Sequence, residues 1–192
     1  MGNHYRTLVV PDVGPEEAEE LAGRGLGWLV AAGIVRAERV RDCVFFAEYG
    51  HLPGPGWARA VADPRRGSGG GVAVHAGRTV FHGCPFFCAH AVCPHCEART
   101  RFFDDEGEAV EGAFDSFAAS IGVWQRTGTA TAACDTCGRA TELTAWTWDQ
   151  NFFAFAHLGF AFWDWPALAP DFLADFASAL GGHRFVQVRG NL

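Results

Sequence analysis

The sequence predicts an α+β fold in which a cysteine-rich segment interrupts a sandwich of sheet and helices. Each end of the chain has the pattern of a strand, a helix and a second strand, and two Cys-x-x-Cys pairs lie between these ends. With 192 residues and a hydrophobic content of 49%, the chain can bury one substantial core without disulfide bonds. We therefore expect one globular domain with an insertion rather than two independent domains.

The N-terminal unit begins with a predicted strand at residues 5–10, which is rich in β-branched residues and stops at Pro11. Pro15 and the glutamates that follow it are typical of a helix N-terminus, and we expect a helix from about residue 15 to residue 32. Its glycines at 23, 25 and 27 each cost ~1 kcal/mol relative to alanine, so only packing can hold this helix. Residues 41–49 are predicted to form the second strand.

Turns and a hairpin are predicted next. Residues 50–56 are rich in glycine and proline, and residues 63–71 form a glycine-rich loop. This loop lacks the Gly-Lys-Ser/Thr of a phosphate-binding loop, and residues 72–81 alternate like a hairpin rather than continuing as a helix. We therefore interpret it as a simple loop.

The C-terminal unit mirrors the N-terminal one. Residues 152–163 are aromatic and poor in charge, as in a buried strand, and a helix begins near Pro170 and ends at a Gly-Gly pair. Residues 183–189 alternate as the last strand. Two such β-α-β units resemble a ferredoxin-like split β-α-β sandwich, built here from residues 1–81 plus 147–192, with residues 82–146 inserted.

The inserted segment carries four cysteines at zinc-ligand spacing, namely Cys93, Cys96, Cys134 and Cys137. Four thiolates complete a tetrahedral zinc site and leave no position open for substrate, so we expect one structural Zn²⁺ ion. Gly138 suits the turn after the second pair, because that turn favours a residue tolerant of positive φ. Residues 97–133 separate the two pairs, and we expect a helix at about 113–124 within them.

The motif Cys-Pro-His-Cys…Cys-Asp-Thr-Cys-Gly resembles the zinc-ribbon class over residues 90–145. The flanking segments at 158–166 and 179–183 resemble a family of bacterial proteins with no established activity. The resemblance implies an inserted zinc ribbon with four cysteine ligands and no catalytic residues.

A second group of metal-competent side chains precedes the first pair, at His82, Cys84, Cys88 and His90. Imidazole and thiolate donors together would suit zinc or copper, and His51 or His157 could complete an open site of a metalloenzyme or metal-handling protein. We favour the alternative that both cysteines are small buried hydrophobes, because their spacing lacks the geometry of a Cys-x-x-Cys turn.

Four tryptophans bracket one aromatic segment, at Trp146, Trp148, Trp163 and Trp165. Their ordinary role would be to join the ribbon to the main sheet, but they could also line a pocket for a small molecule or a peptide. We expect the most ligandable cavity at this junction, bordered by some of the four.

The residue composition and net charge limit the classes of function that the protein can have. All 15 basic residues are arginine and the net charge is −7, which excludes lysine chemistry and disfavours nucleic acid as a partner. No apolar run is long enough to span a membrane, and paired Cys-x-x-Cys motifs more often bind metal in a reducing compartment. We therefore predict a small soluble cytoplasmic zinc protein that is non-catalytic and recognises a small ligand or a partner protein.

Overall fold

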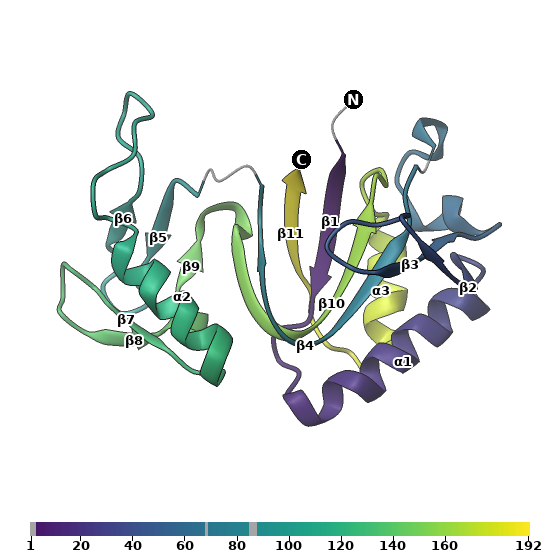
Figure 1. The fold of residues 1–192 in the computed structure, drawn as a ribbon, viewed down its shortest axis with the longest axis horizontal. Coiled ribbons are helices and arrows are strands. Elements are labelled where there is room, and N and C mark those ends of the chain that lie inside the picture. The colour runs from purple at the N-terminus through teal and green to yellow at the C-terminus, as the bar shows by residue number, and fades with distance from the viewer. Residues whose placement is uncertain (1–2, 68, 85–87) are drawn as a thin grey trace.

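The computed structural model describes residues 3–67, 69–84 and 88–192. The fold is a mixture of helices and strands, with three α-helices and a large antiparallel sheet. Figure 1 shows this sheet and two of the helices at one end of the molecule, and the cysteine-rich insertion at the other. In the described part of the chain, no helix combines the length and the apolar character needed to cross a membrane.

The main sheet has six strands in the order β11-β1-β10-β4-β3-β2, and all neighbours are antiparallel. The strands are β1 (His4–Val9), β2 (Val35–Arg41), β3 (Tyr49–Pro53), β4 (Val72–His82), β10 (Phe153–Trp163) and β11 (Val186–Asn191). Short 3-10 turns at Trp57–Ala60 and Pro64–Arg66 connect β3 to β4.

The prediction of one strand over residues 41–49 is wrong. Strand β2 ends at Arg41 and β3 begins at Tyr49, while the residues between them form a loop that includes positive φ angles at Asp42 and Phe46. Phe45 and Phe46 of this loop lie against the ring of Trp163, at centroid distances of 5.0 and 5.8 Å. Contact with a distant aromatic residue thus overrides the local β propensity of the loop.

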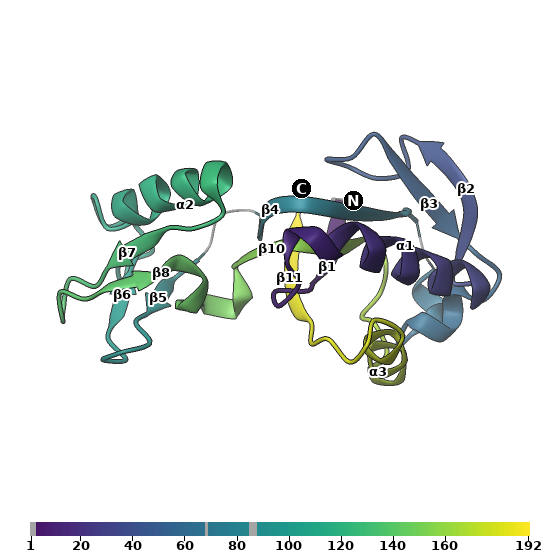
Figure 2. The ribbon, with the colours of Figure 1, turned by 90° about the horizontal axis from the view of Figure 1, so that it is seen from below.

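Helices α1 (Pro15–Ala31) and α3 (Pro170–Ala179) cover one face of the main sheet (Figure 2). The core between them contains Leu8 of β1, Phe160 of β10, Leu29 of α1 and Phe176 of α3, all fully buried. Alternate positions of β1 and β10 face this core because successive side chains of a strand point to opposite faces.

The segment between β4 and β10 spans the predicted insertion at 82–146 and also residues 147–152, and it is called the insertion below. It forms small elements around a second core. It contains β5 (His90–Val92), β6 (Arg99–Arg101), α2 (Asp115–Thr127), β7 (Thr131–Ala133), β8 (Ala140–Glu142) and β9 (Thr147–Trp148), with 3-10 turns at Leu143–Ala145 and Asp149–Asn151. Strands β6-β5-β9 form one sheet and β7-β8 form another. The core they enclose is aromatic and includes Phe117, Trp124 and Phe155.

Strands β4 and β10 belong to both halves of the molecule. An irregularity in their pairing places two residues of β4, Gly77 and Arg78, opposite the single residue His157, and Gly77 adopts a φ of 114° there. Such a bulge shifts the alternation of a strand by one residue. Before the bulge Phe153 and Phe155 of β10 reach the second core, and after it Leu158 and Phe160 reach the first.

Candidate metal centre and junction cavity

Two turns of the same shape carry the four cysteines of the insertion. In the first turn the backbone N–H of Glu97 donates to the carbonyl of Cys93 at 3.0 Å, and in the second the N–H of Gly138 donates to the carbonyl of Cys134 at 2.7 Å. Glu97 and Gly138 have φ angles of 59° and 69°, so each turn closes through a left-handed residue. This confirms the expectation for Gly138.

The four sulfur atoms lie within 4.8 Å of one another. The Sγ atoms of Cys93 and Cys137 are 4.0 Å apart, and those of Cys96 and Cys134 are 3.7 Å apart. Tetrahedral ligands at a metal–sulfur bond of ~2.3 Å are separated by about 3.8 Å, which matches these distances. The four cysteines can therefore hold one metal ion between the two turns.

Backbone donors favour the thiolate form of Cys134, whereas burial and the neighbouring thiols raise the pKa of Cys96. The N–H groups of Cys137 and Thr136 point at the sulfur of Cys134 and lower its pKa to about 7. The N–H of His95 lies 3.5 Å from the sulfur of Cys93. Because a metal binds the thiolate and not the thiol, these donors suit a ligand set. His95 itself is exposed on the turn.

The second predicted group of donors is not brought together in the described residues. Cys88 is buried in the second core, its S–H lies 3.6 Å from the carbonyl of His90, and burial raises the pKa of its thiol to about 12. The Nδ1 atom of His82 lies 2.9 Å from the carbonyl of Gly83. Residues 85–87 lie outside the described residues, and within the described part the only cluster of three or more metal donors is the four-cysteine one.

The two further candidate histidines lie apart from each other. The Nδ1 atom of His51 on β3 is 3.0 Å from the carbonyl of Arg36. His157 lies at the bulge of β10, beside the ring of Trp124 at a centroid distance of 6.1 Å. Neither is grouped with metal donors in the part of the chain that the structure describes.

Two of the four tryptophans border a cavity of about 520 Å³ at the junction of the insertion and the main sheet. Trp146 and Trp148 line it from the insertion, while Pro11, Arg184 and Val186 line it from the other side. Both tryptophans are about 95% buried, and their indole N–H groups have no hydrogen-bond acceptor among the described residues. We call this space the junction cavity.

The other two tryptophans lie at the far end of β10. Trp165 is fully buried in the first core and its indole N–H donates to the carbonyl of Gly70 at 3.1 Å. Trp163 lies on the opposite face of the sheet, where its ring is 4.8 Å from that of Tyr5. The structure therefore separates the predicted set into two pairs, and only the pair from the insertion lines the junction cavity.

Sequence reasoning missed the main-sheet wall of the junction cavity. Pro11 follows β1, and Arg184 and Val186 lie near the C-terminus, so neither segment is close to the tryptophans along the chain. Only the pairing of β1 with β11 and β10 brings these segments together. No local pattern of the sequence carries that information.

Comparisons with family models, with curated proteins and with solved structures found no match for this chain. The class of site is therefore defined by the residues themselves. These are a cluster of four cysteines able to hold a metal ion, and a cavity bordered by two buried tryptophans.

Proposed function

We propose that the four-cysteine cluster binds one zinc ion and that the insertion is a zinc ribbon. Two similar turns, each presenting a Cys-x-x-Cys pair, support this assignment. Soft thiolate donors in tetrahedral arrangement suit zinc, and a set of four leaves no coordination position for a substrate. In this proposal the ion stabilises the fold of the ribbon and performs no reaction.

The topology proposed for the main sheet is the ferredoxin-like split β-α-β arrangement. When the β2-β3 hairpin is set aside, the remaining strands follow the order β11-β1-β10-β4. Helix α1 leads away from β1, helix α3 connects β10 to β11, and both pack on the same face. The hairpin and the ribbon are then two additions to this sandwich.

The proposed function is non-catalytic recognition of a small ligand or a partner protein at the junction cavity. The observation that carries this proposal is the cavity itself, which the buried tryptophans Trp146 and Trp148 border. Aromatic side chains combined with a few polar groups are the usual lining of small-molecule sites. The volume of about 520 Å³ is in the range of small-molecule sites.

Tryptophan fluorescence with a panel of metabolites and peptides tests this function. We expect a ligand whose affinity falls at least about tenfold in Trp146→Phe, which keeps an aromatic ring but removes the N–H donor. Trp124→Phe is the matched control, because Trp124 is buried in the same core but does not line the cavity. Equal loss of affinity in both variants would contradict the proposal.

We propose that nucleic acid is not a partner of this protein and that the protein works in the reducing cytoplasm. The supporting observations are the net charge of −7 and the clustered thiols. Fluorescence anisotropy with a labelled oligonucleotide at physiological salt is the direct measurement. Salt-sensitive binding would contradict this part of the proposal.

A metalloenzyme or metal handler with a second site at His82–His90 is the alternative. Metal analysis of protein purified without added metal separates the two. One zinc per chain supports the structural role, whereas a second metal supports the alternative.

A further inference from the structure

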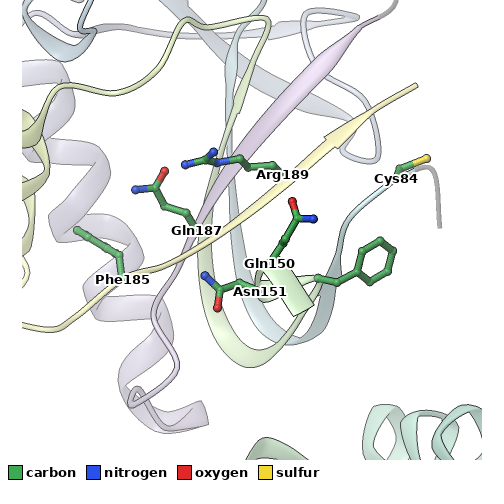
Figure 3. Close-up of a pocket in the computed structure, with 7 residues that line it drawn as sticks. Cys84, Gln150, Asn151, Phe185, Gln187 and Arg189 are labelled. Atoms are coloured by element: carbon green, nitrogen blue, oxygen red, sulfur yellow. The ribbon is translucent and has the colours of Figure 1, made fainter. Parts of the chain in front are cut away.

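A polar cavity of about 590 Å³ lies along β11, the edge strand of the main sheet (Figure 3). It shares Asn151 with the junction cavity, but its other lining residues differ. The side chains of Gln187 and Arg189 line it from β11, and Gln150 and Asn151 line it from the turn after β9. A smaller cavity of about 250 Å³ adjoins it, shares Arg189 and Cys84, and adds Arg6 of β1. We call the two together the β11 cavity.

Two arginines of the β11 cavity face each other without a counterion. Arg6 and Arg189 are direct partners in the register of β1 and β11, an arrangement in which like charges repel. Neither forms an ion pair or a side-chain hydrogen bond with a described residue, and the Nε of Arg6 is buried without an acceptor. Burial, and then the charge of Arg189, lower the pKa of Arg6.

The side-chain amides that line the β11 cavity also lack a hydrogen-bond partner among the described residues. The side chains of Gln150, Asn151 and Gln187 form no hydrogen bond within the described part of the chain. Gln150 and Asn151 adopt φ angles of 50° and 55° in succession. Left-handed backbone at a non-glycine residue costs roughly 1–3 kcal/mol, and it persists only where the surroundings impose it. Figure 3 shows these two residues beside β11, the strand that carries Gln187 and Arg189.

The charge of the lining is of one sign. Its described residues include two arginines, Arg6 and Arg189, and no aspartate or glutamate. This contrasts with the chain as a whole, which carries a net charge of −7. A concave site lined by one sign of charge concentrates ligands of the opposite sign.

We propose that the β11 cavity binds a small anion bearing a phosphate or carboxylate group. Arg189 and Arg6 supply the opposite charge, because a guanidinium matches the oxygens of either group with paired N–H donors. Gln150, Asn151 and Gln187 supply neutral donors around it. The ligand would remove the repulsion between the two arginines, and the volume suits a small metabolite.

The test is a titration of the full-length, metal-loaded protein, followed by ¹⁵N-¹H correlation spectra and by calorimetry. Inorganic phosphate is the probe in one arm, and succinate in the other. We expect saturable binding of at least one probe, with the largest shifts in β11 and in residues 149–151. Arg189→Gln is expected to weaken that binding by at least about tenfold, since it removes a charge-assisted pair of hydrogen bonds.

Arg184→Gln is the matched control. Arg184 precedes the same strand and carries the same charge, but it lines the junction cavity instead. We expect it to change the affinity for either probe less than about twofold, because its side chain does not line the β11 cavity and exposed charges are screened by salt. Arg189 is exposed, so its substitution should not impair folding.

The outcomes separate the two ligand sources and the two cavities. Binding of phosphate alone, or of succinate alone, supports the site and identifies the group it takes. Absence of saturable binding for both probes, or equal weakening by Arg184→Gln and Arg189→Gln, would overturn the proposal. Trp146→Phe should leave this binding unchanged, so failure here is distinguishable from failure at the junction cavity.

Discussion

The surroundings of two cysteines in this protein shift their thiol pKa values in opposite directions. Burial in the second core raises the pKa of Cys88 to about 12, whereas backbone N–H donors lower that of Cys134 to about 7. The first thiol behaves as a small hydrophobic group, and the second is ready to bind metal. The pKa of a single thiol does not identify the candidate ligands, since burial and the neighbouring thiols also raise the pKa of Cys96 in the cluster; the grouping of four sulfur atoms does.

At the residue scale, Cys134→Ser should lose most of the bound metal. The substitution removes one thiolate of four, and metal-binding energy is also folding energy in such a site. Cys84→Ser is the control, since Cys84 lies outside the four-cysteine cluster. Elemental analysis and thermal unfolding measure both effects. Full metal content and an unchanged melting curve in Cys134→Ser would disprove the assignment of the cluster.

A second prediction concerns His75 on β4, where burial lowers the pKa below its ordinary value of 6.5. As the pH falls through 6.5, the unfolded chain takes up a proton at this residue before the folded chain does, so acid destabilises the fold. We expect His75→Leu to lose less stability than the wild type between about pH 7.5 and about pH 5.5. Urea unfolding with zinc in excess measures this, and an NMR titration of the imidazole gives the pKa directly. A pKa above 6.5 would contradict it.

At the scale of elements, helix α1 shows how packing tolerates poor helix formers. A Cβ atom at Gly25 would lie 2.5 Å from Cζ of Phe160, so glycine is required where the helix approaches the sheet. Gly23 and Gly27 have open space around the same position. Their presence costs helix propensity and provides no such contact.

The three glycines of α1 give a matched series of substitutions. We expect Gly25→Ala to destabilise the protein by about 1–3 kcal/mol through overpacking. Gly23→Ala and Gly27→Ala should each stabilise it by about 0.5–1 kcal/mol, because alanine is the better helix former. Denaturant unfolding of the three variants measures these effects. The same sign for all three would show that α1 does not pack as described.

An arginine of the main sheet also holds the insertion in place. The guanidinium of Arg78, in the bulge of β4, donates to the carbonyls of Arg126 and Gln125 at 2.7 and 3.4 Å, which lie at the C-terminal end of α2. A cation at this end satisfies free carbonyl groups and complements the helix dipole. Strand β4 therefore forms part of the main sheet and also fixes the C-terminal end of α2.

At the scale of the molecule, two cores share β4 and β10 but otherwise use different elements. The first is built on α1 and α3, and the second includes Cys93 and Cys134 of the cysteine cluster. Loss of metal should therefore affect the second core first, because only that core depends on the cluster for closure.

The corresponding experiment is removal of metal with a chelator, followed by amide hydrogen exchange. We expect α2 and strands β5 to β9 to lose protection, while β1, β11 and the part of β10 after the bulge keep theirs. Lowering the pH should have the same effect, because protons compete with the metal for thiolates. Simultaneous loss of protection in both cores would show that they unfold as one unit.

Several elements could be predicted from the sequence because their signals are local. The proline, glutamate and apolar positions of α1 predicted its start and length, and the same holds for Pro170 and α3. The helix expected at about 113–124 is α2, and its amphipathic pattern is again local. The four cysteines indicated a metal cluster by their spacing, and the structure brings them together.

Other features depended on contacts between distant segments. Residues 42–48 leave the sheet because Phe45 and Phe46 meet Trp163, and the tryptophans separate because a bulge and a long strand lie between them. The β11 cavity joins Arg6 to Arg189, which are partners only across a strand pair. The sequence by itself thus determined the four-cysteine cluster and the main helices, since spacing and periodicity are local. The tertiary structure alone decided both cavities, because strand pairing sets which side chains share a wall.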